Sequence, residues 1–312
     1  MMLNARTVTT GLKFPEGPIA MPDGTVLVIE IEGTRLIRIH PDGAQDVIAT
    51  LGGGPNGAAV GPDGQCYVCN NGGFNWIHEP DGFSRPHGRA DAYGGGSIQR
   101  VDLETGAVET LYTHCDGNPI MGPNDIVFDG DGGFWFTDHG KTYDRLMDRG
   151  ALFYARVDGS FIREAAFGML TPNGVGLSPD GKTLYASETE TGRLWAWPII
   201  GPGELAKEPW PSPAGGKFIG GPTGYQRFDS MALEANGNIC VATLVTGGIS
   251  VFSPDGRLLE YHQASERYCT NICFGGPDMM TAFITLSGYG TLIAVDWPRP
   301  GLPLVHQGRV FG

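Results

Sequence analysis

The chain has 312 residues and a formal net charge of −13, and it is rich in glycine (50 residues) and proline (23 residues). So many chain breakers exclude a helix bundle and are typical of short strands joined by tight turns. The acidic balance argues against a nucleic-acid partner, which requires a basic surface, and against an anionic membrane. Hydrophobic residues make up 41% of the chain, so we expect a folded core and one domain over residues 1–312.

The cellular setting is inferred from what the sequence lacks. The chain has no run of 18 consecutive apolar residues, and its N-terminus lacks the apolar stretch of a signal peptide. Its six cysteines are therefore expected to be free thiols of a cytoplasmic protein. A monomer and a small homo-oligomer both remain open.

A hairpin signal recurs along the chain. An Asp-Gly or Asn-Gly pair, which tolerates the positive φ of a tight turn, separates two apolar runs. In chain order these hairpins cover residues 19–30, 58–70, 126–138, 175–187 and 231–243, and a weaker copy surrounds Asp278. We expect two antiparallel strands at each.

Seven residues before the Asp or Asn of each turn stands an acid or an amide, here called an anchor. The six anchors are Glu16, Asn56, Asn124, Asn173, Asp229 and Asn271. Their spacings of 40, 68, 49, 56 and 42 residues are about what four short strands with turns require. The sequence therefore predicts an all-β, six-bladed β-propeller with a central-channel metal site.

In a propeller the innermost strand of each blade lines the channel, so the six anchors would share one mouth. Because buried acids and amides are costly without partners, we interpret them as functional. The positions fourteen residues further on should return to the same mouth, and all are polar: Glu30, Asn70, Asp138, Ser187, Thr243 and Thr285. For this second ring a simple strand-end role is an equal alternative.

The anchors form a set of hard oxygen donors without histidine or cysteine. Glu16 and Asp229 supply negative charge, whereas Asn124 and Asn173 supply carbonyl oxygens. This set fits Ca²⁺, Mg²⁺ or Mn²⁺ better than a soft metal. A divalent ion there would polarise a carbonyl and lower the pKa of a bound water.

Several segments resemble one known family, and together they extend over nearly the whole chain in order. They are residues 14–18 (FPEGP), 123–125 (PND), 172–174 (PNG), 228–231 (FDSM) and 270–276 (TNICFGG). The chain is similar here to the gluconolactonase, senescence marker protein and luciferin-regenerating enzyme family, whose members are six-bladed propellers. The resemblance implies metal-dependent hydrolysis of a small-molecule lactone, with Ca²⁺ first and Mg²⁺, Mn²⁺, Zn²⁺ or Fe²⁺ as alternatives.

The resemblance also implies residue roles. Glu16, Asn173 and Asp229 match the metal-ligand positions, and Asn124 matches an asparagine that faces substrate and metal. We further expect Asn56, Asn271, Asp138 and His139 to line the substrate pocket. Our mechanistic hypothesis makes Asp229 the base that accepts a proton from the attacking water.

The sequence departs from the sugar-lactonase pattern at Gly122, two residues before Asn124, where some sugar-lactone hydrolases carry arginine. The substrate is therefore not necessarily a sugar lactone. The long interval between the second and third anchors contains an extra segment, about residues 72–96, with five aromatic or histidine side chains: Trp76, His78, Phe83, His87 and Tyr93. We interpret it as a lid-like insertion, with a surface or dimer-contact loop as the alternative.

Two other functions remain open for the same ring of anchors. Related propellers hydrolyse organophosphates with a similar Glu, Asn, Asn, Asp set, so phosphotriester hydrolysis is one alternative. The other is a non-catalytic, calcium-stabilised propeller scaffold. Two carboxylates and several amides at one channel mouth favour catalysis over the scaffold.

Overall fold

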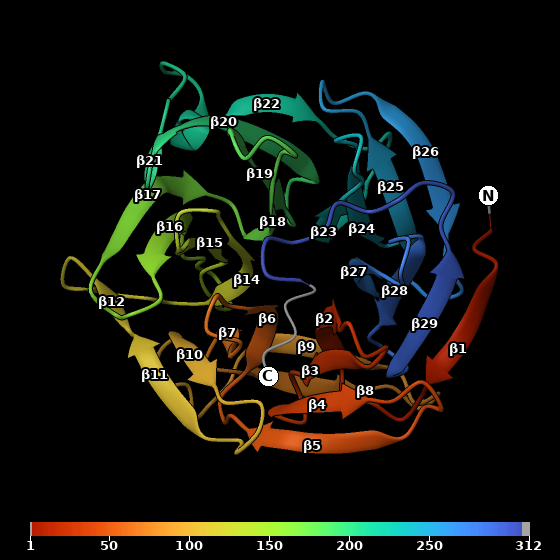
Figure 1. The fold of residues 1–312 in the computed structure, drawn as a ribbon. Helices are drawn as coiled ribbons and strands as arrows, with labels where there is room; N and C mark the ends of the chain where they lie inside the picture. The colour runs from red at the N-terminus through yellow and green to blue at the C-terminus, as the bar shows by residue number, and fades with distance from the viewer. Residues whose placement is uncertain (1, 308–312) are drawn as a thin grey trace.

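The computed structural model describes residues 2–307, and nearly all of its regular structure is β-strand. Six antiparallel sheets of four or five strands stand around a central channel (Figure 1). The predicted six-bladed propeller is thus confirmed. Within residues 2–307 the helical structure is a single 3-10 turn, η1 (Pro213–Gly215), and no helix is long and apolar enough to cross a bilayer.

Each blade has four layers of strands, numbered here from the channel outwards. The first layer of blades 1 to 6 consists of β2 (Pro15–Ala20), β6 (Pro55–Val60), β14 (Pro123–Phe128), β18 (Pro172–Leu177), β23 (Arg227–Leu233) and β27 (Cys269–Gly275). The second layer consists of β3 (Val26–Glu30), β7 (Cys66–Asn70), β15 (Gly133–Asp138), β19 (Thr183–Glu188), β24 (Ile239–Leu244) and β28 (Thr281–Leu286).

The two outer layers complete the blades. The third layer consists of β4 (Arg35–Ile39), β10 (Ser97–Val101), β16 (Gly150–Arg156), β20 (Arg193–Gly201), β25 (Gly248–Phe252) and β29 (Thr291–Asp296). The fourth layer consists of β5 (Gln45–Thr50), β11 (Val108–Tyr112), β17 (Ile162–Met169), β22 (Lys217–Gly220), β26 (Leu258–Gln263) and β1 (Ala5–Thr9), with β21 (Glu204–Leu205) also paired to β20. A short hairpin, β12 (His114–Cys115) and β13 (Asn118–Pro119), connects blades 2 and 3.

The ring closes in two ways. Strand β1, from the start of the chain, pairs with β29 and completes blade 6. The innermost strands also contact one another in sequence, from β2 with β6 around to β27 with β2. Large apolar side chains such as Trp135, Trp197 and Trp297 are fully buried in the core, and all six cysteines are buried free thiols, as predicted.

Glycines directly after three anchors allow the innermost strands to approach closely. A Cβ built on Gly57 would lie 2.4 Å from the carbonyl oxygen of Asn124, and one on Gly174 would lie 2.7 Å from the amide nitrogen of Met231. Gly17 is equally crowded, against the Asn56 carbonyl oxygen. These glycines set the spacing of the anchors because no side chain fits between the strands.

The extra segment of blade 2 forms a hairpin of β8 (Phe74–His78) and β9 (Ser84–Arg89), between β7 and β10. It leaves the blade after Asn70, at the mouth where the anchors lie. In Figure 1 the C-terminal end of the described chain crosses in front of the channel, and the hairpin lies behind blade 1. The hairpin and the C-terminal segment therefore lie on opposite faces of the ring.

Candidate active site

The six anchors occupy equivalent positions at the start of the innermost strands, and each is between 3% and 9% exposed. In every blade the pairing with the second strand changes register at or next to the anchor. Such bulges free a residue from the ladder and re-aim its side chain. The structure thus gathers Glu16, Asn56, Asn124, Asn173, Asp229 and Asn271 in one ring at the channel mouth.

Glu16 is held by two donors. Nδ2 of Asn271 donates a hydrogen bond of 2.7 Å to its Oε2, and the Gly17 amide donates a second of 2.9 Å to the same oxygen. Burial nevertheless raises the pKa of Glu16 above its ordinary value.

Asp229 and its neighbour Asn173 supply the second carboxylate of the ring and an amide beside it. Ser187 Oγ fixes the main-chain oxygen of Asp229 at 2.7 Å. Asn173 accepts a hydrogen bond of 3.3 Å from Ser230 Oγ and donates one of 3.1 Å to Thr189 Oγ1. Burial, followed by the negative charge of Glu16, raises the pKa of Asp229 well above the ordinary aspartate value.

Asn124 carries an unpaired acceptor. Its Oδ1 is buried and has no hydrogen-bond partner among residues 2–307, although the residue is only 6% exposed. An orphaned buried carbonyl oxygen costs about 1–3 kcal/mol. A cation, a water molecule or a substrate group would supply the missing partner.

A third carboxylate, Asp125, lies directly below the ring, and the sequence reasoning missed it. Its Oδ1 accepts a hydrogen bond of 3.0 Å from the Ile126 amide, and its Oδ2 accepts one of 3.3 Å from the Val175 amide. Burial raises its pKa to about 7, and the charge of Glu16 adds to the effect. The sequence did contain a signal for Asp125. It is an acid directly after an anchor, at the position that Gly17 and Gly174 occupy in other blades.

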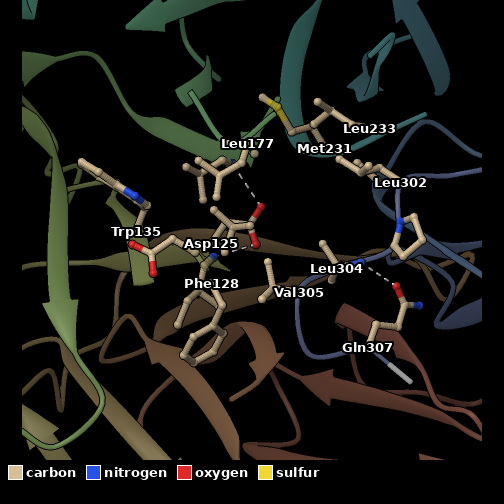
Figure 2. A pocket seen from close by; sticks show the side chains of 18 of the residues that line it. Asp125, Phe128, Trp135, Leu177, Met231, Leu233, Leu302, Leu304, Val305 and Gln307 are labelled. Atoms are coloured by element: carbon tan, nitrogen blue, oxygen red, sulfur yellow. Dashed lines mark hydrogen bonds between the residues drawn. The ribbon is translucent and has the colours of Figure 1, made fainter. Parts of the chain in front are cut away.

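A cavity of about 600 Å³ opens below the ring, on the channel side that faces the C-terminal segment. Figure 2 shows the carboxylate of Asp125 surrounded by apolar side chains that include Phe128, Leu177, Met231 and Val305. The cavity is closed by the segment 302–307, which is tied down by the Leu302 amide to the Leu233 carbonyl (2.8 Å) and by Gln307 Nε2 to the Phe274 carbonyl (2.6 Å). Most of the lining is apolar, but Asn271 and Asp125 also line the cavity, so it adjoins the polar ring.

The second polar ring lies at the ends of the second strands, and its acids brace loops. Asp138 accepts hydrogen bonds from the amides of Met121, Gly122 and Gly140, at 2.7, 2.7 and 2.8 Å. Glu30 accepts the Lys13 amide at 2.8 Å and pairs with Arg35. Both oxygens of Asp138 thus accept hydrogen bonds from main-chain amides.

His139 follows Asp138 and is half-buried, with its amide bound to the Gly122 carbonyl at 2.8 Å. Burial and the positive charge of Lys141 lower its pKa to about 4, so the imidazole is neutral near pH 7. Lys141 and its partner Asn71 were not anticipated; Lys141 Nζ donates to Asn71 Oδ1 at 3.1 Å. Like Asn124 Oδ1, the Nδ2 of Asn71 is a buried atom without a hydrogen-bond partner in the described chain.

The residues of the ring fit a hard divalent cation. Across residues 2–307 no group of three or more His, Cys, Asp and Glu side chains is arranged to hold a metal, so a site here depends on amide oxygens as well. Within the same residues no lysine or arginine forms an ion pair with Glu16, Asp125 or Asp229. Three buried carboxylates repel one another here, and Asn124 Oδ1 lacks a partner. A bound cation would stabilise all four groups.

Comparisons with known proteins found relatives that are named as hydrolases. The chain is 25% identical to a gluconolactonase of Zymomonas mobilis over 90% of its own length and 78% of the relative's. It is 26% identical to the lactonase drp35 of Staphylococcus saprophyticus, over 76% of this chain and 66% of the relative. A diisopropyl-fluorophosphatase of Loligo vulgaris is 28% identical over 63% of this chain and 64% of that one.

Solved structures have the same fold. A gluconolactonase of Xanthomonas campestris superposes with a TM-score of 0.72 at 23% identity, covering 94% of this chain and 90% of that one. The calcium-binding protein regucalcin of Agrobacterium tumefaciens gives 0.73 at 18% identity, covering 97% and 99%. The family model described as the SMP-30/Gluconolactonase/LRE-like region matches residues 14–288, and the chain therefore belongs to this family.

Proposed function

We propose that the protein is a metal-dependent hydrolase that opens the ring of a small-molecule lactone. The observation that best supports this function is that two buried carboxylates, Glu16 of blade 1 and Asp229 of blade 5, belong to the same ring as the unpartnered Oδ1 of Asn124. Relatives named gluconolactonase and lactonase support hydrolysis of a cyclic ester.

Glu16, Asn173 and Asp229 would hold the cation, and Asn124 would face the cation or the substrate. Oxygen-only donors favour Ca²⁺, with Mg²⁺, Mn²⁺, Zn²⁺ and Fe²⁺ as alternatives. When bound, the cation would polarise the lactone carbonyl and offset the buried negative charge.

Asp229 is the proposed general base. As the oxygen of water attacks the carbonyl carbon, the Asp229 carboxylate takes up a proton from that water. The bond between the carbonyl carbon and the ring oxygen then breaks, and the ring oxygen receives the proton to give the hydroxy acid. Ser187 and Asn173 hold Asp229 in position for both transfers.

The remaining anchors are proposed to position the reactants. Asn271 orients Glu16 through its 2.7 Å hydrogen bond, and Asn56 presents an amide from the adjoining blade. Asp138 acts indirectly, since it fixes the Gly122 and Gly140 amides on either side of His139. A neutral His139 can then donate to or accept from a substrate group at the mouth.

The test is acid release from a panel of lactones by chelator-treated protein, with each divalent cation added back in turn. We expect turnover to depend on one of these cations. Asp229→Asn should abolish turnover while the circular dichroism spectrum stays unchanged. Full activity in verified metal-free protein would remove the metal from the proposal, and near wild-type activity of Asp229→Asn would reject the base.

Phosphotriester hydrolysis is the second candidate, favoured by the similarity to a diisopropyl-fluorophosphatase. A phosphoryl oxygen could occupy the position proposed for the lactone carbonyl. Diisopropyl fluorophosphate in the same assay distinguishes the two, because the better substrate is the one with the higher kcat/KM. No turnover of either class would favour the scaffold.

A further inference from the structure

The insertion is fastened to the anchor mouth by three contacts, two with blade 6 and one with blade 1. Its Ser84 amide donates to the Gly288 carbonyl at 2.8 Å, beyond the end of β28 in blade 6. Its His78 ring lies 3.2 Å from a Glu32 carboxylate oxygen, beyond the end of β3 in blade 1. Tyr289 donates to Asp81 Oδ2 at 2.9 Å. The hairpin β8–β9 is thus held against blades 1 and 6, next to Glu16 and Asn271.

Aromatic rings from the insertion and from the two blades form one continuous group. The ring of Trp76 lies 4.9 Å from that of Phe14, and Phe14 lies 6.1 Å from Tyr268. Phe83 also stacks on Tyr268, with ring centres 5.1 Å apart. We call Phe14, Trp76 and Tyr268 the aromatic wall.

The aromatic wall lies beside the anchors. Phe14 directly precedes β2 and comes two residues before Glu16, and Tyr268 directly precedes β27 and comes three residues before Asn271. Trp76 and Tyr268 are only half-buried, so both rings retain exposed surface.

Lys141 ties both ends of the insertion to blade 3. Besides Asn71, its buried ammonium group donates to the Gly73 carbonyl at 3.2 Å. The same nitrogen lies 4.4 Å from the ring centre of Phe74, where the insertion begins, and 5.1 Å from that of Tyr93, where it ends. The Tyr93 hydroxyl in turn donates a hydrogen bond of 2.6 Å to the carbonyl oxygen of Met121, which lies three residues before Asn124.

Two cationic side chains at this mouth are engaged by other protein groups. Arg227 pairs with Glu190 at 2.8 Å, and Lys141 is enclosed by the insertion. A side chain at Gly122 is excluded by packing, since a Cβ there would lie 2.6 Å from the Gly140 carbonyl oxygen. The arginine of some sugar-lactone hydrolases therefore has no room in this loop.

We propose that the insertion is a fixed wall of the substrate pocket, that its aromatic surface selects lactones with an aromatic or alkyl substituent, and that Lys141 is the positioning residue that fixes it. The inference rests on the proposed lactonase function and specifies its substrate class. Burial of an aromatic or alkyl group against these rings supplies binding energy that a sugar ring would not.

The experiment compares kcat/KM for dihydrocoumarin, δ-decalactone, δ-valerolactone and glucono-δ-lactone. Wild-type protein should prefer dihydrocoumarin or δ-decalactone to glucono-δ-lactone by at least tenfold. Trp76→Ala should lower kcat/KM for the two substituted lactones at least tenfold through KM, with less than threefold change for δ-valerolactone. Trp76→Phe should recover most of the loss. Trp210→Ala, which removes a tryptophan that is 91% exposed, is the matched control and should change nothing.

Lys141→Met removes the ammonium group and keeps the length of the side chain. We expect KM for δ-decalactone to rise five- to tenfold, and clearly more than KM for δ-valerolactone, together with faster proteolysis within residues 74–93. Equal losses on all lactones, or a preference for glucono-δ-lactone in wild-type protein, would overturn the inference while leaving the lactonase intact. A dimer that dissociates in Trp76→Ala would also overturn it, in favour of an interface loop. No lactone turnover would instead reject the proposed function itself.

Discussion

Asn271 donates a 2.7 Å hydrogen bond to Glu16 although 255 residues separate them in the chain. The bond joins the innermost strand of blade 6 to that of blade 1, where the ring closes. It consequently couples the closure of the fold to the orientation of a proposed metal ligand. If the contact between these two strands loosens, we expect Glu16 to lose its orientation before the outer strands of either blade are disturbed.

Asn271→Ala should weaken cation binding and catalysis together. Glu16 would lose one of its two donors, and a hydrogen bond to a charged group contributes about 1.5–3 kcal/mol. We expect a Ca²⁺ dissociation constant and a kcat/KM that are each about tenfold to a hundredfold worse, measured by calorimetry and acid release. Asn4→Ala, which removes an exposed amide, is the control. Unchanged Ca²⁺ affinity would show that Asn271 does not orient a ligand.

The double variant Glu16→Gln with Asp229→Asn should be more stable than wild type in the absence of cations. Two buried carboxylates that repel each other would become neutral amides, so the free energy of unfolding should rise by about 1–3 kcal/mol. Ca²⁺ should raise the Tm of wild type but not of the double variant.

The matched control for that experiment is Glu104→Gln with Glu208→Gln. Both residues are exposed, and the net charge changes by the same amount. This pair should leave the Tm and its Ca²⁺ response as in wild type. Equal Ca²⁺ stabilisation of the Glu16 and Asp229 double variant would place the cation elsewhere.

The positions of the anchors could be predicted because a hairpin has a nearly fixed length. Counting back from an Asp-Gly or Asn-Gly turn reaches the first residues of the innermost strand in five blades, and the weaker turn at Asp278 supplies the sixth repetition of a closed ring. The same count brought Glu16 and Asn271 to one mouth. It depends only on local turn chemistry and on the two-residue period of strands.

Other features depended on contacts that local patterns do not encode. Asp125 stands where neighbouring blades have glycine, and only the close approach of β14 to β18 shows that its Oδ2 meets the Val175 amide. Lys141 is unremarkable in sequence, yet its partners Asn71 and Gly73 lie about 70 residues away. The docking of the insertion likewise depends on loops of blades 1 and 6.

Glu266 predicts a specific pH dependence of stability. It accepts the Gly288 and Tyr289 amides at 2.6 and 3.3 Å, but burial dominates and raises its pKa from 4.5 to about 7. A carboxyl whose pKa is higher in the folded than in the unfolded state contributes stability at low pH, and this contribution is lost as the pH rises through about 7. The full difference corresponds to roughly 3 kcal/mol.

Urea unfolding of wild type and Glu266→Gln between pH 4.5 and pH 8 measures this contribution. We expect the free energy of unfolding of wild type to fall relative to the variant across that range. The exposed Glu208→Gln should run parallel to wild type. A constant difference between wild type and Glu266→Gln would mean that Glu266 titrates alike in both states.

Gly174→Ala tests whether close strand approach builds the ring. Gly174 has no positive φ, so the substitution acts through packing alone, against the Met231 amide nitrogen at 2.7 Å and the Asp229 carbonyl oxygen at 2.9 Å. We expect destabilisation of about 1–3 kcal/mol, as for overpacked cores, measured by urea unfolding. Since the crowded atoms belong to Asp229 and its neighbours, kcat should also fall at a temperature where the variant is fully folded.

Gly130→Ala is the matched control, because a Cβ there meets nothing within 4 Å and its φ is not positive either. Its free energy of unfolding should stay within about 0.5 kcal/mol of wild type. If Gly174→Ala loses stability but keeps its kcat, the strands can separate without moving Asp229, and the spacing of the ring would not control its chemistry. If both fall together, the glycine after the anchor is as much a part of the site as the anchor itself.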